Sequence, residues 1–262
     1  MKGRTIWRAV QWLAGLTALA ALGILLRNGA GRGQSERVFA RMRQYRPAAT
    51  AAVTTPAPSP AETAAPTPPP IDFAALRQTW PDVVAWIQWP LMGLDLPIVQ
   101  GDTNETYLRA LPDGSWSNGG SLFLEANSES VLDWHAIVYG HNMQDGSMFG
   151  QLKRWLEGDF YREHRDEAFF LLYTPEGVWR YDLFSIERVQ STDPGVYRLL
   201  YQPGETFAAF ARAMETRTLY PMEARADGER PVLTLSTCDS AGAARGNRVA
   251  LHAVQAARPD QG

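Results

Sequence analysis

The hydrophobic positions of the chain fall into three regions with different spacing. The first is a run of eighteen residues, 9–26, in which Gln11 is the only strongly polar member and which Arg8 and Arg27 bound. As a helix with a rise of about 1.5 Å per residue, it spans about 27 Å, close to the thickness of the hydrocarbon core of a bilayer. The pattern therefore favours a retained transmembrane helix.

Two other interpretations of this run remain open. Residues 18–20 (ALA) have the small-x-small form of a signal-peptide cleavage site, although apolar residues continue through Leu26. A buried core helix is the second alternative. Basic residues at positions 2, 4 and 8 favour a cytoplasmic N-terminus, but six arginines between 27 and 46 weaken that signal.

The second region, 47–70, contains eight Pro, eight Ala and five Thr among its 24 residues. Such a composition forms no core, and its prolines favour an extended, solvated polyproline II chain, about 75 Å long at ~3.1 Å per residue. We expect a disordered stalk that separates a folded domain from the bilayer. The basic residues 35–46 ahead of it predict a short helix near the lipid headgroups.

The third region, 71–258, carries the patterns of a folded domain. Phe73, Leu76, Trp80 and Ile87 recur at helical spacing, and Pro81 predicts a break within that pattern. Further helices are expected at 148–156, after the candidate N-cap Ser147, and at 207–214. Segments rich in β-branched and aromatic residues predict strands at 96–99, 121–124, 136–139, 168–173, 178–186, 231–237 and 248–254. Many strands without regular βαβ alternation indicate a mostly antiparallel barrel or sandwich with helices at its edge.

These patterns divide the chain into five parts. We expect a cytoplasmic tip and transmembrane anchor at 1–27, a basic juxtamembrane segment at 28–46, a stalk at 47–70, a domain at 71–258 and a tail at 259–262. The composition adds three exclusions. A net charge of −3 lacks the basic surplus of an ordinary nucleic-acid-binding protein. The single cysteine excludes an internal disulfide or a multi-cysteine metal site, and no HExxH pattern or acidic cluster indicates a metal.

The single cysteine, Cys238, is either an inert buried thiol or a reactive one. It ends an alternating strand pattern and shares a face with Ser236. A small polar loop follows, and a second strand starts at Arg248. If the two strands pair antiparallel, Cys238 lies opposite Arg248, whose guanidinium would stabilise a thiolate or an oxyanion.

A reactive thiol needs a proton partner, and His141 is the best-placed histidine. It closes the strand pattern 136–141 and enters a glycine-containing loop, although a surface or capping role is the alternative. His252 shares a strand face with Arg248 but lies about 13 Å from it, so we interpret it as structural. His135 and His164 fall in polar sequence and are expected to be exposed.

The motifs around these residues resemble the sortase family, and class B sortases in particular. The run TLSTC at 234–238, followed ten residues later by Arg248, resembles the sortase signature. The runs YGHNM at 139–143 and DGSMF at 145–149 resemble class B, as do 81–87, 97–100, Asn104 with 107–108, and 120–124. The likeness covers nearly all of 71–258. Glu125 stands where an aspartate is common in the family.

This resemblance implies a closed sortase-type barrel and a cysteine transpeptidase without a cofactor or metal. Cys238 would attack a threonine carbonyl in the C-terminal sorting motif of a secreted protein and form a thioacyl-enzyme. His141 would exchange protons with the leaving and incoming amines, and Arg248 would bind the substrate carbonyl or the oxyanion. Matching positions imply substrate-groove roles for Asn104, Leu108, Thr192, Tyr197 and Ser236. Packing or turn formation is the alternative for each of them.

The resemblance also implies partners and a location. The partners would be secreted proteins with a sorting motif and an amine nucleophile, either a peptidoglycan precursor or a pilin lysine. We favour anchoring of surface proteins over pilin polymerisation, and a catalytically silent scaffold is the remaining alternative. Together with the predicted anchor, this places the chain in the cell membrane as a single-pass protein whose catalytic domain is extracellular.

Overall fold

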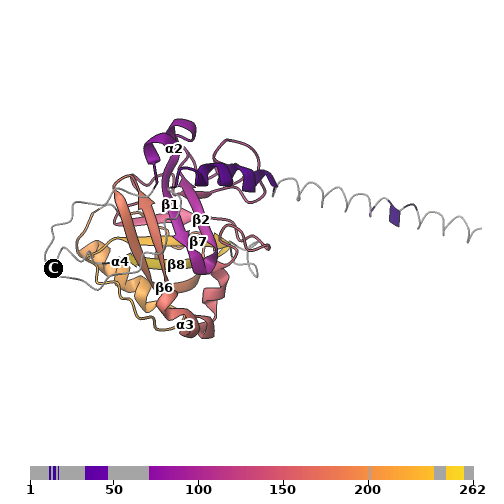
Figure 1. The fold of residues 1–262 in the computed structure, drawn as a ribbon. Coiled ribbons are helices and arrows are strands. Elements are labelled where there is room, and N and C mark those ends of the chain that lie inside the picture. Colours follow the sequence, from indigo (N-terminus) through magenta and orange to yellow (C-terminus); the bar gives the residue numbers. More distant parts are fainter. Residues whose placement is uncertain are drawn as a thin grey trace, which may run out of the picture.

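The computed structural model describes residues 12, 14, 15, 17, 33–46, 71–200, 202–238 and 246–256. Eight strands close into a barrel in the order β1-β2-β3-β4-β7-β8-β6-β5 (Figure 1). They are β1 (Val83–Trp89), β2 (Leu94–Val99), β3 (Leu122–Leu124), β4 (His135–Tyr139), β5 (Phe169–Thr174), β6 (Gly177–Gln190), β7 (Val232–Cys238) and β8 (Asn247–Gln255). The predicted barrel is confirmed.

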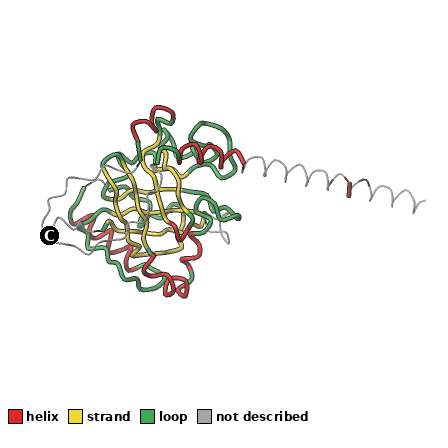
Figure 2. The backbone as a smooth tube through the Cα atoms, viewed as in Figure 1, coloured by secondary structure: helices red, strands yellow, loops and turns green. Residues whose placement is uncertain are grey.

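Short helices surround the strands (Figure 2). They are α2 (Phe73–Thr79), η1 (Pro90–Met92), η2 (Leu152–Leu156), α3 (Gly158–His164), η3 (Arg165–Glu167) and α4 (Glu205–Thr216). The expected helix at 207–214 is α4. Its residues Phe207, Phe210 and Met214 are buried against Phe184 and Val254 of the barrel wall, so α4 covers an outer face of the sheet.

Most neighbouring strands are antiparallel, as expected, but β2–β3 and β4–β7 are parallel. In the β4–β7 ladder, Tyr139 pairs with Ser236, so both chains leave the sheet at the same edge. Because β7 also pairs antiparallel with β8, the start of β8 lies at that edge too. The ends of β4 and β7 and the start of β8 therefore meet there, although β4 lies far from the other two in the sequence.

Strand β7 is buried on both faces except at its end. Leu233 and Leu235 point into the main core, whereas Thr234 and Ser236 lie on the opposite face and are also buried. Sheets covered on both sides lose the simple inside-outside alternation of polarity. Polar side chains on this outer face must therefore satisfy one another, and they do so in the network described below.

The first strand was misread in the sequence. The helical pattern that begins at Phe73 ends at Thr79 with α2, whose N-cap Asp72 accepts a hydrogen bond from the Ala75 amide at 2.9 Å. Residues 83–89 form β1 and not a second helix, and they pair with β2 and β5. Their composition, VVAWIQW, is β-branched and aromatic, which favours a strand once Pro81 has broken the helix.

The helix expected from residue 148 was also misplaced. Met148 has a left-handed φ of 50° and forms a bridge with Asn142, so the chain is still in a loop there. The loop is tight because a Cβ at Gly150 would overlap the Met143 carbonyl oxygen. Only the short 3-10 helix η2 follows, and helix α3, for which no pattern was recognised, comes directly after it.

The basic segment ahead of the stalk packs on the barrel. Residues 33–43 are helical, and Val38, Phe39 and Met42 are buried in the main core. The Arg46 guanidinium pairs with Asp95 of β2. This helix therefore lies against protein along its apolar face, where the sequence had suggested contact with lipid headgroups.

Among the residues that the structure describes, no helix has both the length and the apolarity needed to cross a bilayer. The expected transmembrane run 9–26 lies outside the described residues, apart from four scattered helical positions at 12, 14, 15 and 17. The stalk 47–70 and the tail 259–262 lie outside them as well.

Candidate active site

The candidate site lies where β4, β7 and β8 meet. His141 and Cys238 each follow the paired residues Tyr139 and Ser236 by two positions, so the two side chains leave the same edge of adjacent parallel strands. The Asn142 side chain fixes this arrangement because its Nδ2 donates to the Cys238 carbonyl at 2.8 Å. The sequence placed His141 at a strand end but offered no pairing partner for that strand.

Cys238 and Arg248 face each other across the β7–β8 ladder, as the sequence predicted. Nη1 of Arg248 donates to Sγ of Cys238 at 3.2 Å. Cys238 is half-buried, so the residue is partly exposed to solvent. A guanidinium in this position lies beside any carbonyl that the sulfur attacks, where it stabilises a developing oxyanion.

His141 is held by the backbone of the β2–β3 connection. Its Nε2 lies 2.8 Å from the Leu108 carbonyl oxygen. A carbonyl only accepts hydrogen bonds, so Nε2 carries the proton and Nδ1 of the neutral ring is a free base. Burial lowers the pKa of His141, and the cations Arg109 and Arg248 lower it further, while the Leu108 carbonyl opposes them. The ring is therefore neutral near pH 7 and able to accept a proton.

Of the five predicted groove residues, three lie next to the catalytic groups and two do not contact them. Tyr197 and Ser236 lie directly below the site, with the Tyr197 hydroxyl 2.8 Å from Oγ of Ser236. Leu108 is 38% exposed beside His141, which its carbonyl holds. Asn104 and Thr192 are exposed on the surface, and within the described part of the chain no hydrogen bond of either side chain reaches the catalytic groups.

Asn104 has a structural task that the sequence did not reveal. Its Nδ2 donates to both carboxylate oxygens of Glu125 at 2.7 Å, and its Oδ1 accepts from the Ala126 amide. The Tyr139 hydroxyl donates to the same carboxylate at 2.9 Å. Glu125 is 8% exposed, so these donors satisfy a buried carboxyl group beside the strand that leads to His141. The position of Glu125 directly after a predicted strand was the feature of the sequence that could have indicated this role.

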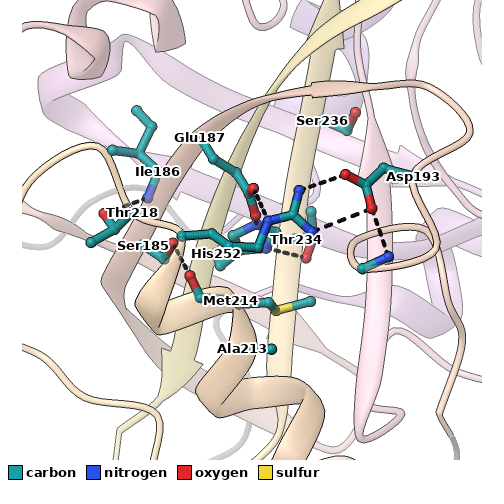
Figure 3. A network of polar contacts seen from close by, with 12 residues as sticks. Ser185, Ile186, Glu187, Asp193, Ala213, Met214, Thr218, Thr234, Ser236 and His252 are labelled. Atoms are coloured by element: carbon teal, nitrogen blue, oxygen red, sulfur yellow. Dashed lines mark hydrogen bonds and ion pairs between the residues drawn. The ribbon is translucent and has the colours of Figure 1, made fainter.

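A second polar network covers the outer face of β7 and β8 (Figure 3). Thr234 Oγ1 lies 2.8 Å from both His135 Nε2 and His252 Nδ1, and His252 Nε2 lies 2.9 Å from Glu187. The structural role expected for His252 is thereby confirmed. The expectation that His135 is exposed was wrong, because its side chain is fully buried and burial lowers its pKa to about 3. His164 is half-buried on α3, beside Glu167.

A cavity of about 560 Å³ lies behind the 142–148 loop. The helix over 33–43 forms one wall, with Glu36, Phe39 and Arg43, while Asn142, Asp145 and Met148 line the other. Cys238, His141 and Arg248 do not line it, so the cavity is separate from the cysteine's own surroundings. Asn142, which bonds to the Cys238 carbonyl, also lines this cavity.

A metal centre has no support in the described residues, among which no group of three His, Cys, Asp or Glu side chains is placed to hold an ion. What the arrangement can do follows from its three groups. A thiol lies against a guanidinium, and a neutral imidazole leaves the sheet beside them. These are the parts required for nucleophilic attack on a carbonyl with proton transfer.

The fold and site together define a closed eight-stranded β-barrel protein that carries a cysteine, a histidine and an arginine at one edge. A family profile described as the sortase domain matches residues 87–256, which is more than half of the chain. The chain belongs to the sortase family, and its relatives and structural neighbours are class B sortases.

Two relatives are named sortase B. The protein from Listeria monocytogenes serovar 1/2a (strain ATCC BAA-679 / EGD-e) is 30% identical over 162 residues, which cover 61% of this chain and 63% of the relative. The protein from Staphylococcus aureus (strain NCTC 8325 / PS 47) is 26% identical over 170 residues, which cover 64% and 68%. The matched region thus spans just under two thirds of the Listeria protein's length.

Solved structures show the same fold. Sortase B from B. anthracis in complex with AAEK1 superposes with a TM-score of 0.68 and 25% identity, over 87% of this chain and 99% of that chain. The Staphylococcus aureus sortase B–substrate complex gives a TM-score of 0.63 and 24% identity, over 70% and 84%.

Proposed function

We propose that this protein is a cysteine transpeptidase that cleaves the C-terminal sorting motif of secreted proteins and transfers them to an amine of the cell wall. The observation that carries the proposal is the 3.2 Å contact between Arg248 and Cys238 at the strand edge that His141 also leaves. Family membership and the relatives named sortase B support it.

The reaction follows from the protonation states of these groups. Nδ1 of the neutral His141 accepts the thiol proton as the Cys238 sulfur attacks the carbonyl carbon of the motif's threonine. The tetrahedral oxyanion forms next to the Arg248 guanidinium, which stabilises it. Collapse breaks the peptide bond, His141 returns the proton to the leaving amine, and a thioester remains on Cys238.

The second half of the reaction runs through the same groups in reverse. An incoming amine attacks the thioester carbon and gives its proton to His141. The carbon–sulfur bond breaks, the new amide leaves, and the sulfur recovers a proton from the imidazolium. We favour an amine of a peptidoglycan precursor as the acceptor, which makes the overall reaction the anchoring of surface proteins.

The reaction is tested by acyl-enzyme formation. Incubation with a library of pentapeptides followed by mass spectrometry should give an adduct on Cys238, and adding peptidoglycan-stem amines should release it as a transpeptidation product. Cys238→Ala should abolish both signals, and His141→Ala should reduce turnover by several orders of magnitude. His164→Ala is the matched control, because His164 is a half-buried histidine on α3 that pairs with Glu167. Product formation by Cys238→Ala would refute the proposal.

We also propose that residues 9–26 hold the protein in the cell membrane as a single pass, with the barrel outside the cell. The support is the length and apolarity of that run together with the Pro/Ala/Thr-rich stalk. Membrane fractionation of the full chain, and of a version that lacks residues 1–32, tests the anchor. Recovery of the full chain in the soluble fraction would overturn it.

A further inference from the structure

Arg217 connects the end of α4, strand β6 and the loop over 191–200. It follows α4 directly, and its Nε donates to Glu187 of β6 at 2.8 Å. Its two terminal nitrogens donate to both carboxylate oxygens of Asp193, at 2.5 Å and 3.3 Å. One guanidinium thus links a helix end, a barrel strand and the loop over 191–200. Figure 3 shows Glu187 and Asp193 as neighbouring acidic groups of the polar network.

Asp193 in turn shapes the loop that it begins. Its Oδ1 accepts the Gly195 amide at 2.8 Å, and its carbonyl oxygen accepts the amides of Val196 and Tyr197 at 3.1 Å and 2.9 Å. The fit is close, because a Cβ at Gly195 would overlap the Arg217 guanidinium. Val196 is fully buried against the sheet. These contacts and the Arg217–Asp193 pair therefore tie the loop to the end of α4 and to the sheet.

The loop delivers Tyr197 to the floor of the site. The Tyr197 hydroxyl meets Ser236 at 2.8 Å, and its ring stacks on Tyr139 with 6.3 Å between centroids and 14° between planes. Ser236 and Tyr139 are the last paired residues before Cys238 and His141. Tyr197 therefore braces both strands that carry the reacting groups. Burial raises the pKa of Tyr197 to about 12, so its hydroxyl keeps its proton at neutral pH.

We propose that Arg217 is a positioning residue for catalysis, which acts through Asp193 on Tyr197 and so on the spacing of Cys238 and His141. This inference rests on the proposed function. Arg217 itself need not touch substrate, since its pairs with Glu187 and Asp193 fix the loop to the barrel. A reaction that needs near-attack geometry is sensitive to such supports, because a shift of about 1 Å costs up to ~100-fold in rate.

The main variants separate positioning from general stability. Arg217→Gln removes the positive charge and the paired hydrogen bonds to Asp193. Asp193→Asn keeps the Arg217–Glu187 pair and weakens only the contact between Arg217 and the loop. Arg230→Gln is the matched control: its side chain is 30% exposed against 33% for Arg217, and it also pairs with an aspartate. It lies before the start of β7, at the opposite end of that strand from Cys238.

The test combines turnover with hydrogen exchange on the full-length protein, below the melting temperature of every variant. We expect kcat/KM for the best pentapeptide to fall about tenfold in Arg217→Gln and in Asp193→Asn, and less than about twofold in Arg230→Gln. In a Tyr197→Phe background, Arg217→Gln should have less than about half of its effect on a logarithmic scale. Partial rescue by Arg217→Lys is expected, because the charge remains.

Two kinetic results would overturn the inference. One is an equal loss of kcat/KM in Arg217→Gln and Arg230→Gln, and the other is an effect of Arg217→Gln that Tyr197→Phe leaves unchanged. If the wild-type protein forms no acyl-enzyme, the proposed function fails, and hydrogen exchange alone then decides. Loss of protection at the amides of 195–197 in both Arg217→Gln and Asp193→Asn supports the loop clamp, and unchanged protection refutes it.

Discussion

Gly120 offers a direct test of how the backbone holds His141. Gly120 has a φ of +55°, and a Cβ built on it would overlap the Leu108 carbonyl oxygen and lie 2.6 Å from that of Tyr107. The Leu108 carbonyl is the group that fixes Nε2 of His141. Gly120→Ala therefore pushes a methyl group against the backbone that orients the catalytic imidazole, and backbone cannot move aside as a flexible side chain does.

The cost has two separable parts. A non-glycine residue in the left-handed region costs about 1–2 kcal/mol, and forcing a methyl group into a filled space costs about 1–3 kcal/mol more. Gly93 provides the matched control, because its φ of +64° is similar but nothing lies within 4 Å of the added Cβ. Urea unfolding should therefore show a loss of about 1–2 kcal/mol for Gly93→Ala and of about 2–5 kcal/mol for Gly120→Ala.

The same substitution should change the titration of His141. Burial is the main reason that the pKa of His141 lies below the usual value, and the hydrogen bond to the Leu108 carbonyl raises it. If Gly120→Ala displaces that carbonyl, the pKa of His141 should fall further, so the ring takes up its proton at a lower pH. An NMR titration of the His141 ring protons measures this. Equal stability losses in the two glycine variants, with an unchanged His141 titration, would refute the reasoning.

Three more predictions follow from buried groups. The pKa of His135 is about 3 in the folded protein, so between pH ~6.5 and 3 only the unfolded chain binds a proton at this residue. The free energy of unfolding should therefore fall by up to about 1.4 kcal/mol per pH unit as the pH drops toward 3. Urea titrations of His135→Gln should lack this contribution to the slope. Asn104→Ala removes two hydrogen bonds from the buried Glu125 and should cost about 1.5–3 kcal/mol of unfolding free energy; a raised KM with unchanged stability would show a groove role instead. Trp155→Ala empties a fully buried position beside Met92 and should cost about 3–5 kcal/mol by calorimetry, with normal acyl-enzyme formation per folded molecule.

Much of the barrel could be predicted because its strands are chemically distinct from their loops. The expected strand at 231–237 differs from β7 by one residue at each end, and that at 248–254 differs from β8 in the same way. Strand β1 was not predicted, because the run VVAWIQW is buried at nearly every position and its hydrophobic pattern therefore has no period of two. Periodicity reports exposure on one face, and β1 has almost none.

The site was predictable to the extent that chain neighbours define it. Antiparallel pairing of β7 with β8 is set by one loop, so the register of Cys238 with Arg248 could be read directly. The β4–β7 pair is parallel and joins residues nearly a hundred positions apart, and nothing local specifies it. His141 could therefore be named as a candidate, but its place beside Cys238 came only from the family resemblance.

The polar outer face of β7 and β8 explains the remaining error and has a wider consequence. Thr234, Ser236 and His252 alternate with apolar residues, a pattern that a one-sided sheet would expose to water. Here α4 and the 191–200 loop cover them, so each must find a partner within protein. Thr234 contacts His135 of β4 and His252 of β8, His252 also contacts Glu187 of β6, and Ser236 contacts Tyr197 of the loop. Because unpaired buried polar groups are costly, the contact of Ser236 with Tyr197 and that of His135 with the Arg198 carbonyl hold the 191–200 loop against the sheet. His135 looks exposed by its neighbours in sequence, but it is buried because Phe210 of α4 and the backbone of the 191–200 loop cover it.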